Sequence, residues 1–274
     1  MASAGSNPDR MHRFPMIRGL RNIERRVLPQ GWADAVRQLL LFALAYWGYQ
    51  LVRGMMDSQV AKAAWNATKI INLEHSLHVF AEPSVQAWAS SKAWIIHGAD
   101  WIYLNSHFIV TVGALVYLYL RRNDSFYFVR NMFMIAMGIA LIGYAAFPTA
   151  PPRLMPEWGF TDSIAALTGQ RVENESVSAL LNLYAAVPSM HVCFALMIGW
   201  PLARLVKPRP LKVVWFLYPF LITFVVVATG NHYFFDAFLG ALTAGASALL
   251  AKQLLARWRP EAWSFGRSRA GAAA

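Results

Sequence analysis

The sequence predicts an all-α polytopic membrane protein, in which six transmembrane helices form one bundle. Hydrophobic residues make up 57% of the 274 residues and charged residues only 14%, and the mean hydropathy is +0.36. This balance is too apolar for a soluble domain and is typical of a chain that crosses a membrane several times. Long apolar segments also recur along the chain, with most basic residues beside them.

A transmembrane helix needs about 20 mostly apolar residues. Six segments meet this requirement, and we expect spans at 34–53, 101–120, 126–147, 188–206, 211–230 and 234–256. The start of the second span is open, since residues 94–100 either extend it or lie along the interface. The membrane domain is then 34–256, between a basic segment at 1–33 and a flexible tail at 257–274.

Basic residues are distributed unevenly between the two sides of this bundle. Six arginines precede the first span, and further Lys and Arg residues follow the second, fourth and sixth spans. The other loops are longer but sparsely basic, and the one before the fourth span has only Arg153 and Arg171. Because cytoplasmic loops carry the excess of Lys and Arg, both termini are expected in the cytoplasm. The mouths of the spans near His191 and His232 then face the extracytoplasmic side.

The basic character does not indicate a nucleic-acid partner. The formal net charge is +11, but the basic residues flank apolar spans and do not form one face with interleaved aromatic residues. The single cysteine, Cys193, excludes an internal disulfide and a cysteine-based zinc site. Helix packing in lipid must therefore provide the stability.

Two histidines and an aspartate stand at the mouths of apolar segments. They are His191 in Val187-Pro-Ser-Met-His191, and His232 and Asp236 in Asn231-His-Tyr-Phe-Phe-Asp236. Ionisable groups at membrane depth are costly and mark functional sites. His232 and Asp236 are four residues apart, so one helix face can carry both. The carboxylate would hold one ring nitrogen as a donor and leave the other free to attack, while His191 would protonate a leaving oxygen.

The loop after the third span supplies a cation. It reads Phe147-Pro-Thr-Ala-Pro-Pro-Arg153, and its prolines stop the helix and aim Arg153. A guanidinium suits phosphate oxygens, although an interfacial Arg153 is the alternative. Pro188 is expected at the first helical position of the fourth span, so that Ser189 and its neighbours offer free N–H groups to an anion; helix capping by Ser189 is equally compatible. The two helix mouths and Arg153 predict a phosphate pocket.

At these residues the chain resembles the type 2 phosphatidic acid phosphatase superfamily, and within it the fungal inositol phosphorylceramide synthase branch. The motifs that match are residues 147–153, 185–191 and 231–236 with the following Gly240. The resemblance runs from the second span to the sixth. It implies that His232 takes the phosphoryl group covalently, that Asp236 orients it and that His191 protonates the leaving group. It implies no metal and no cofactor.

Two positions depart from the wider superfamily. Its members usually carry a Lys seven residues before the first-motif Arg and an Arg six residues before the last-motif His, where this chain has Ala146 and Val226. The synthase branch is similar in lacking both cations. The resemblance therefore favours the synthases over the general phosphatases.

We expect an enzyme that transfers a phospho-head group, of the inositol phosphate type, from a membrane phospholipid to a lipid alcohol through a phosphohistidine. Hydrolysis of a lipid phosphomonoester or pyrophosphate is the second hypothesis. A non-catalytic membrane binding protein or transporter is the third, but the chain lacks the paired broken helices and midplane charges that transport favours. The expected location is a bacterial plasma membrane, and the expected partner is a membrane lipid substrate.

Other residues carry weaker signals. Asn182, Tyr184 and Asn231 flank the motifs and are candidate pocket residues, with loop packing as the alternative. A polar patch at the outer end of the second span is a candidate for binding the acceptor; it comprises Asp100, Tyr103, Asn105 and His107. Apolar residues at near-helical spacing predict an amphipathic helix within 61–93 that roofs the site. The polar loop at 156–187 is a candidate lid.

Overall fold

The computed structural model describes residues 28–56, 59–168 and 184–255, which form helices and loops without a β-strand. The α-helices are α2 (Gly31–Met56), α3 (Val60–Ser76), α4 (Glu82–Ser90), α5 (Ala93–Trp101), α6 (His107–Arg121), α7 (Asn123–Ala146), α8 (Ser163–Thr168), α10 (Met190–Leu205), α11 (Arg209–Ala228) and α12 (Phe234–Leu250). Short turns of other pitch are η1 (Ile102–Ser106), η2 (Pro152–Leu154), η3 (Pro156–Trp158) and η4 (Ala251–Leu255). The all-α class is therefore confirmed for the described residues.

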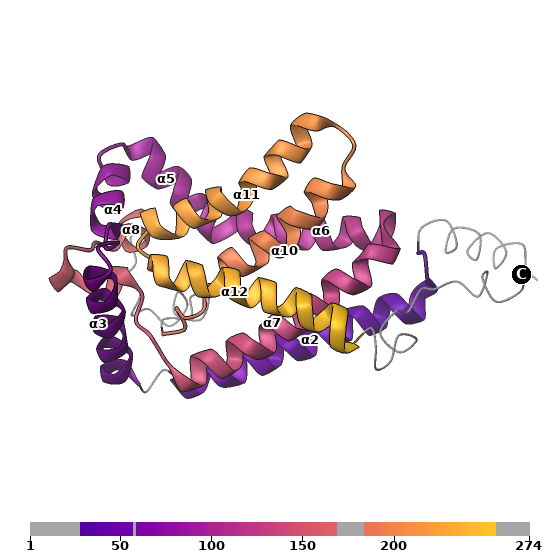
Figure 1. The fold of residues 1–274 in the computed structure, drawn as a ribbon, viewed down its shortest axis with the longest axis horizontal. Coiled ribbons are helices and arrows are strands. Elements are labelled where there is room, and N and C mark those ends of the chain that lie inside the picture. The colour runs from indigo at the N-terminus through magenta and orange to yellow at the C-terminus, as the bar shows by residue number, and fades with distance from the viewer. Residues whose placement is uncertain (1–27, 57–58, 169–183, 256–274) are drawn as a thin grey trace, which may run out of the picture.

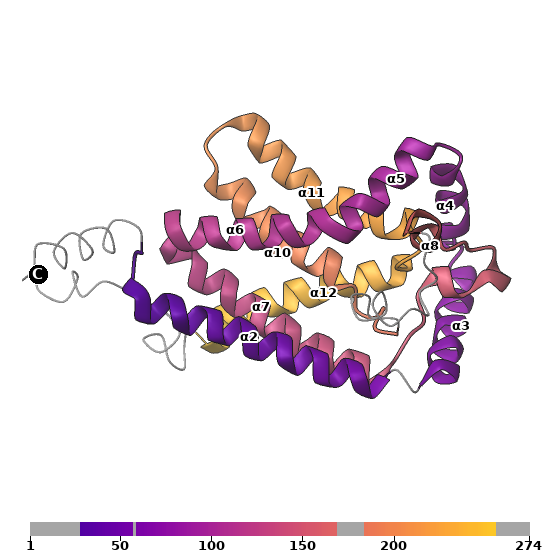
Figure 2. The same cartoon turned by 180° about the vertical axis from the view of Figure 1, so that it is seen from behind.

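The long helices extend along the longest axis of the molecule (Figure 1). The central one is α10, which packs against α6, α7, α11 and α12. On the outside of the bundle, α2 lies along α7 (Figure 2). Helix α3 crosses one end of the bundle, beside the beginning of α12; α4 stands next to α3, and α5 packs beside α4. Segments far apart in the sequence therefore meet at the end that α3 covers.

Four helical stretches among the described residues are long and apolar enough to cross a membrane: Ala93–Arg121, Asn123–Ala146, Arg209–Ala228 and Phe234–Gln253. They correspond to the second, third, fifth and sixth expected spans. The second begins earlier than expected, because α5, η1 and α6 continue as one helix of 29 residues. Residues 94–100 thus extend the span.

The other two expected spans are not confirmed. Helix α2 has 26 residues, but polar side chains such as Asp34, Arg37 and Gln38 lower its hydropathy. Helix α10 is apolar but has only 16 residues. At 1.5 Å per residue it is about 24 Å long, less than the roughly 30 Å of a hydrocarbon core. The six-span topology stays a prediction.

Two polar residues of α2, Asp34 and Gln38, face α7. The Asp34 carboxylate accepts hydrogen bonds from the Tyr127 hydroxyl (2.8 Å), the Tyr119 hydroxyl (3.1 Å) and the Gln38 amide (2.9 Å). The Gln38 oxygen accepts in turn from the guanidinium of Arg130, which is only 1% exposed. Burial of polar groups requires such partners. The network fixes α2 against α7 and turns the apolar side of α2 outward.

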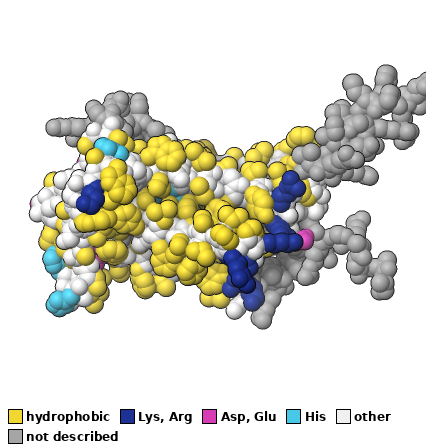
Figure 3. Space-filling model, turned by 90° about the horizontal axis from the view of Figure 1, so that it is seen from above, with side chains coloured by type: hydrophobic (Ala, Val, Ile, Leu, Met, Phe, Trp, Pro, Cys, Tyr) yellow, Lys and Arg dark blue, Asp and Glu magenta, His cyan; other side chains and the backbone are white. Residues whose placement is uncertain are grey.

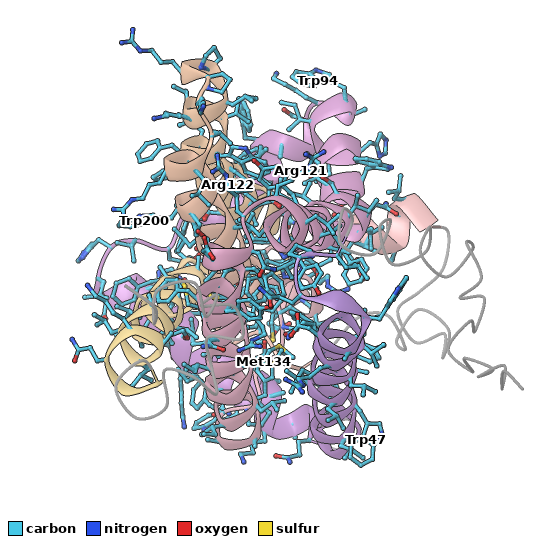
Figure 4. The ribbon with its side chains drawn as sticks, turned by 90° about the vertical axis from the view of Figure 1, so that its right-hand side faces the viewer. Trp47, Trp94, Arg121, Arg122, Met134 and Trp200 are labelled. Carbon is cyan, nitrogen blue, oxygen red and sulfur yellow. The ribbon has the colours of Figure 1, made fainter. Side chains whose placement is uncertain are left out.

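The outer surface of the bundle is apolar. Large side chains more than half exposed occur on several helices, among them Leu40, Phe108, Ile142, Phe220 and Phe238. Figure 3 shows an apolar band on the face it presents, with most of the visible Lys and Arg near one end and the visible His near the other. Along the long axis, Trp47, Trp94 and Trp200 point outward and Met134 points inward (Figure 4). Such a surface is suited to lipid contact.

Cysteine labelling in intact cells tests the orientation. Glu157 in η3 is exposed on the side of α3, whereas Asp124 is exposed at the start of α7, beside Arg121 and Arg122 at the opposite end. We expect an impermeant maleimide to label Glu157→Cys in intact cells and Asp124→Cys only after the membrane is opened. The native Cys193 is 0% exposed and should react little. The reverse pattern would exclude an extracytoplasmic site.

Candidate active site

Three connections meet at the end of the bundle that α3 crosses. They are residues 147–153 after α7, 184–189 before α10 and 229–233 between α11 and α12. The first two lie alongside each other, since the Thr149 N–H donates to the carbonyl oxygen of Tyr184 at 2.8 Å. These connections contain the three sequence motifs, so the fold brings the motifs together.

Helix α3 covers the connections with one face. Its buried positions recur at helical spacing; they are Ala63, Asn66, Ala67, Ile70, Ile71 and Glu74. The N–H of Ala150, in the first connection, donates to the carbonyl oxygen of Ala63 at 3.1 Å. A reversal at His78, with φ of 58°, separates α3 from α4. The roof expected within 61–93 is therefore built from two helices instead of one.

A left-handed glycine fixes the link between α11 and α12. Gly230 has φ of 67° and its N–H donates to the carbonyl oxygen of Val227 at 3.0 Å, while the Asn231 N–H donates to that of Val226 at 2.9 Å. This is the Schellman pattern that ends helices at a glycine. The His232 N–H also bonds to Val226, at 3.1 Å. The backbone at His232 is thus held by the end of α11 before α12 begins.

His232 precedes α12, and Asp236 lies in its first turn. Asp236 Oδ2 is 3.3 Å from His232 Nδ1 and also accepts the N–H of Tyr233 at 3.0 Å. The expected pair is therefore in contact, although His232 stands before the helix and not within it. His232 is 5% exposed and Asp236 0%. Because a carboxylate only accepts, Nδ1 is the donor and Nε2 keeps its lone pair.

The beginning of α10 packs directly against the first turn of α12. Ser189 is the N-cap of α10; its Oγ accepts from the Val192 N–H at 3.5 Å, and its own N–H donates to the carbonyl oxygen of Asp236 at 3.0 Å. Gly240 allows this approach, because a Cβ there would overlap the Ser189 carbonyl oxygen. Pro188 lies before the cap, after a cis peptide bond, so its expected place at the first helical position is wrong.

His191 faces His232 across this contact. Nδ1 of His191 lies 3.4 Å from Nε2 of His232. Since Asp236 occupies Nδ1 of His232, the Nε2 atom accepts and His191 donates. Burial, together with the charge of Arg153, lowers the pKa of His232 to about 3. The ring is therefore neutral at physiological pH, which is the nucleophilic form.

Arg153 lies close to His232. Its N–H donates to the carbonyl oxygen of Gly230 at 2.8 Å, two residues before His232. The residue is 4% exposed, yet Nε and Nη1 have no hydrogen-bond partner among the described residues. Asp162 Oδ2 is 3.9 Å from Nη1, which is an ion pair without a hydrogen bond. A buried guanidinium with unsatisfied N–H groups is suited to hold an anion.

Only one of the two expected helix mouths is open to phosphate. At α10, the Ser189 N–H is already bonded, but the N–H groups of Met190 and His191 have no acceptor in the described parts of the chain. At α12, the first two N–H groups donate to the carboxylates of Glu82 and Glu74, at 2.9 and 2.7 Å. The expectation that both mouths bind phosphate is therefore wrong for α12, whose donors are bonded to protein carboxylates.

Residues of the long second span line the other side of His191. The Tyr103 ring stacks on the His191 ring with centroids 4.6 Å apart, and the His107 ring centroid is 4.8 Å away. The Tyr218 hydroxyl is 3.5 Å from Nδ1 of His107. The expected polar patch thus contributes Tyr103 and His107 to the site, whereas Asn105 is exposed. Tyr103 and His107 are four residues apart, a spacing that places both side chains on the same helix face.

The beginning of the loop after the first motif is tied to the roof. The Gln86 amide donates to the carbonyl oxygen of Thr161 at 2.9 Å and accepts from its N–H at 3.0 Å. Asp100 accepts from the Ser163 hydroxyl at 2.8 Å. Sequence reasoning missed Gln86, because a lone Gln in a short helix carries no motif. The lid hypothesis for 156–187 stays a prediction.

The three candidate pocket residues, Asn182, Tyr184 and Asn231, have different positions relative to the site. Asn182 lies within 169–183, outside the described residues. Tyr184 joins the first two connections through its carbonyl oxygen. Asn231 is 3% exposed; its amide donates to the Thr229 hydroxyl at 2.7 Å, while its Oδ1 has no partner among the described residues. Asn231 is thus buried within the link, with one acceptor left over.

The departures from the superfamily pattern leave neutral positions near the site. Val226 is 0% exposed within an apolar cluster, and Ala146 is the last residue of α7. Among the described residues, no group of three or more His, Cys, Asp or Glu side chains is arranged to hold a metal ion. The charges available around His232 are those of Arg153 and the carboxylates of α3, α4 and α12.

The comparisons with known proteins agree with this geometry at the level of a superfamily. A family model described as the PAP2 superfamily matches residues 68–250, more than half of the 274 residues. The matched segment runs from α3 to the end of α12 and contains all three motifs. No curated protein and no solved structure matches the chain. The synthase branch stays a prediction.

The contact of α10 with α12 can be tested with one methyl group. In Gly240→Ala the new Cβ forces the Ser189 turn away from Asp236, and overpacking of this kind costs about 1–3 kcal/mol. Because His191 then moves relative to His232, we expect turnover to fall by about 100-fold. The matched control is Gly245→Ala in the same helix, where a Cβ meets nothing within 4 Å.

Thermal unfolding in detergent and turnover of a nitrophenyl phosphoester are the two measurements. Gly245→Ala should be at least as stable and as active as the wild type, since alanine favours a helix over glycine by about 1 kcal/mol. Equal activity of the two alanine variants would show that the close approach does not align the histidines.

Proposed function

The chain belongs to the PAP2 superfamily, and from this premise we propose that it transfers a phospho-head group from a membrane phospholipid to a lipid alcohol through a phosphohistidine. The head group is of the inositol phosphate type, as the resemblance to the synthase branch implies. The enzyme acts in a bacterial plasma membrane on the extracytoplasmic side. One observation carries the proposal: His232 contacts Asp236 through Nδ1 and His191 through Nε2.

His232 is the nucleophile in this proposal. Asp236 keeps the proton on Nδ1, so the lone pair of Nε2 is available for attack on phosphorus. A P–N bond forms while the P–O bond to the donor lipid breaks. His191, protonated on both nitrogens once an anionic phosphate is bound, gives its Nδ1 proton to the leaving oxygen. The donor leaves as a neutral lipid alcohol.

The acceptor alcohol then takes the phosphoryl group from His232 by the same steps in reverse. Its hydroxyl attacks phosphorus and passes its proton to His191, the P–N bond breaks, and His232 regains its free Nε2. With water as the acceptor, the same steps give hydrolysis. Because Nε2 of His232 and Nδ1 of His191 are only 3.4 Å apart, the phosphorus must enter by separating the two rings.

The remaining groups bind the phosphate oxygens. Arg153 offers the unsatisfied N–H groups of a buried guanidinium, and the first turn of α10 offers the N–H groups of Met190 and His191. Ser189 acts on phosphate through this turn, since it caps the helix whose N–H groups face the anion. These donors match the charge that develops on equatorial oxygens during phosphoryl transfer.

The charge balance favours a phosphodiester over a monoester. A phosphomonoester carries about −1.5 to −2 charges at neutral pH, whereas a diester carries one. Two cations common in the superfamily are replaced by Ala146 and Val226, and the acidic pair of Glu74 and Glu82 lies close to the α12 turn. This environment repels a second negative charge. Transfer of a diester head group is therefore preferred to monoester hydrolysis.

Labelled lipids test the proposal directly. Purified protein is incubated with head-group-labelled phosphatidylinositol or with phosphatidic acid, each with and without a ceramide-type or diacylglycerol acceptor. We expect label on the acceptor lipid from the diester, and no product with His232→Ala. On a nitrophenyl phosphodiester, His232→Ala should stay inactive, whereas His191→Ala should keep burst release because nitrophenolate needs no proton. The loss of His191 on the natural lipid should be about 100-fold to 10,000-fold.

Several outcomes would contradict it. Phosphate release from phosphatidic acid without acceptor transfer would favour the hydrolase. Labelled phosphate trapped on His191 would show that His191 and not His232 is the nucleophile. Activity in His232→Ala would show that catalysis needs no phosphohistidine at His232. A wild type inactive on every lipid and on the nitrophenyl ester would refute catalysis.

Arg153→Lys tests the phosphate clamp. Lysine keeps the charge but not the planar fork, so hydrogen bonds to the phosphate are lost. Each such charged bond contributes about 1.5–3 kcal/mol, and we expect kcat/KM to fall by at least about 10-fold. The control is Arg204→Lys, since Arg204 is exposed and stacks on Trp200. Near-normal kcat/KM in Arg153→Lys would make Arg153 an interfacial residue.

A further inference from the structure

The first turn of α12 is held by three different carboxylates. The N–H groups of residues 233, 234 and 235 donate in turn to Asp236, Glu82 and Glu74, at 3.0, 2.9 and 2.7 Å. The first N–H groups of a helix have no partner within it and need acceptors. Asp236 belongs to the helix itself, but Glu74 comes from α3 and Glu82 from α4. The two roof helices are thus bonded to the helix end that follows His232.

Glu74 and Glu82 form a buried pair. They are 2% and 0% exposed, and each uses one oxygen, Oε1, for the α12 turn. Their Oε2 atoms have no hydrogen-bond partner among the described residues. Because the two Oε1 atoms accept from the consecutive N–H groups of Phe234 and Phe235, the two carboxyl groups lie close together. Two buried carboxylates at this distance cannot both stay ionised.

The groups around the pair are acidic. Glu82 and Asp236 act on Glu74, and the buried Tyr233 hydroxyl lies in the same cluster, with Glu157 as a further acidic neighbour. Burial, followed by the hydrogen bond to Glu82 and the charge of Glu82, raises the pKa of Glu74 to about 9. Burial and these carboxylates also raise the pKa of Tyr233. Glu74 therefore keeps its proton at neutral pH.

We propose that Glu74 and Glu82 are positioning residues: a carboxyl pair that shares one proton and fixes the first turn of α12, and through it the orientation of the His232 ring. The assignment rests on the proposed function, because orientation matters only if His232 reacts. The coupling is short, since the turn that donates to the pair also carries Asp236, whose Oδ2 holds Nδ1 of His232.

The pair also determines where phosphate binds. A helix mouth attracts anions, and the α12 mouth lies next to the nucleophile. With its N–H groups bonded to Glu74 and Glu82, this mouth is closed to phosphate oxygens, and the charge of the pair repels them. Phosphate is left with Arg153 and the α10 turn, on the side from which Nε2 of His232 can attack.

The shared proton predicts a pH dependence. The pKa of Glu74 is about 9 in the folded protein against an ordinary value of 4.5. A raised pKa means that the Glu74 contribution to stability is full below about pH 4.5 and declines as the pH rises toward 9. Near pH 9 the proton leaves, the two carboxylates repel each other, and the α12 turn loses its alignment. Activity should therefore fall near pH 9.

Glu74→Gln is the decisive variant. Glutamine has the shape of a protonated Glu and keeps both a donor and an acceptor, but it cannot ionise. At pH 7 we expect kcat on the nitrophenyl phosphodiester to stay within about threefold of the wild type, because the amide oxygen can still accept from the Phe235 N–H and the side chain stays neutral. The alkaline decline near pH 9 should disappear. Glu74→Ala removes the bond to the α12 turn, and we expect kcat to fall by about 10-fold or more while KM changes little.

Glu157→Gln is the matched control, since Glu157 is an exposed acid near the same cluster. It should keep the alkaline decline. If Glu74→Gln does not fold, Glu82→Gln carries the same test, because loss of either carboxyl removes the mutual repulsion. An unchanged alkaline decline in the Gln variant, or wild-type kcat in Glu74→Ala, would overturn the assignment.

Thermal unfolding separates this inference from the proposed function. The melting temperature of the wild type should fall from pH 5 to pH 9 more steeply than that of Glu74→Gln, whether or not the protein turns over any phosphoester. If the wild type and Glu74→Gln differ in their unfolding profiles although the wild type turns over no phosphoester, the shared proton is supported. That result would nevertheless reject both the phosphotransferase and the positioning role. Identical unfolding profiles would reject the shared proton itself.

Discussion

The site depends on the close contact between the first turns of α10 and α12. One backbone hydrogen bond, from the Ser189 N–H to the Asp236 carbonyl oxygen, joins the two turns, and Gly240 leaves the space for it. His191 lies in the first turn of α10 and His232 stands directly before α12, so their 3.4 Å contact follows from the backbone approach. A side chain in place of Gly240 would separate not only two helices but the two ring nitrogens that the proposed chemistry needs.

Polar groups inside the bundle fall into two kinds. In the network of α2 and α7, Asp34 accepts three hydrogen bonds and Gln38 bonds to Arg130. At the α3 end, Arg153 and Asn231 each keep buried polar atoms without a partner among the described residues. Unsatisfied buried polar groups lower the stability of the folded protein. We therefore expect them where a bound ligand supplies the missing hydrogen-bond partners. A buried guanidinium is the costliest of these groups to leave unpaired, so Arg153 points to the α3 end as the candidate site.

The features that could be predicted from the sequence are those that depend on residues close together in the chain. His232 and Asp236 are four residues apart, and the prolines before Arg153 define a turn, so local geometry suffices to identify both. Glu74 and Glu82 carry no such signal, because their partners are backbone N–H groups about 150 residues later, and only the packing of α3 and α4 on α12 joins them. The prediction that the α12 mouth binds phosphate is wrong for the same reason, since no nearby residue in the sequence indicates that distant carboxyl groups occupy it.

The closed and open helix mouths together give the phosphate one direction of approach. Acidic side chains occupy the mouth of α12, while the buried Arg153 guanidinium and the first turn of α10 keep donors without a partner among the described residues. An anion is thus repelled from the helix that carries Asp236 and attracted to the helix that carries His191. In the proposed mechanism, the phosphorus then faces Nε2 of His232 and the leaving oxygen lies near the His191 ring. Negative charge close to a phosphate site, which at first looks unfavourable for binding, selects the geometry in which attack and protonation occur on one bound substrate.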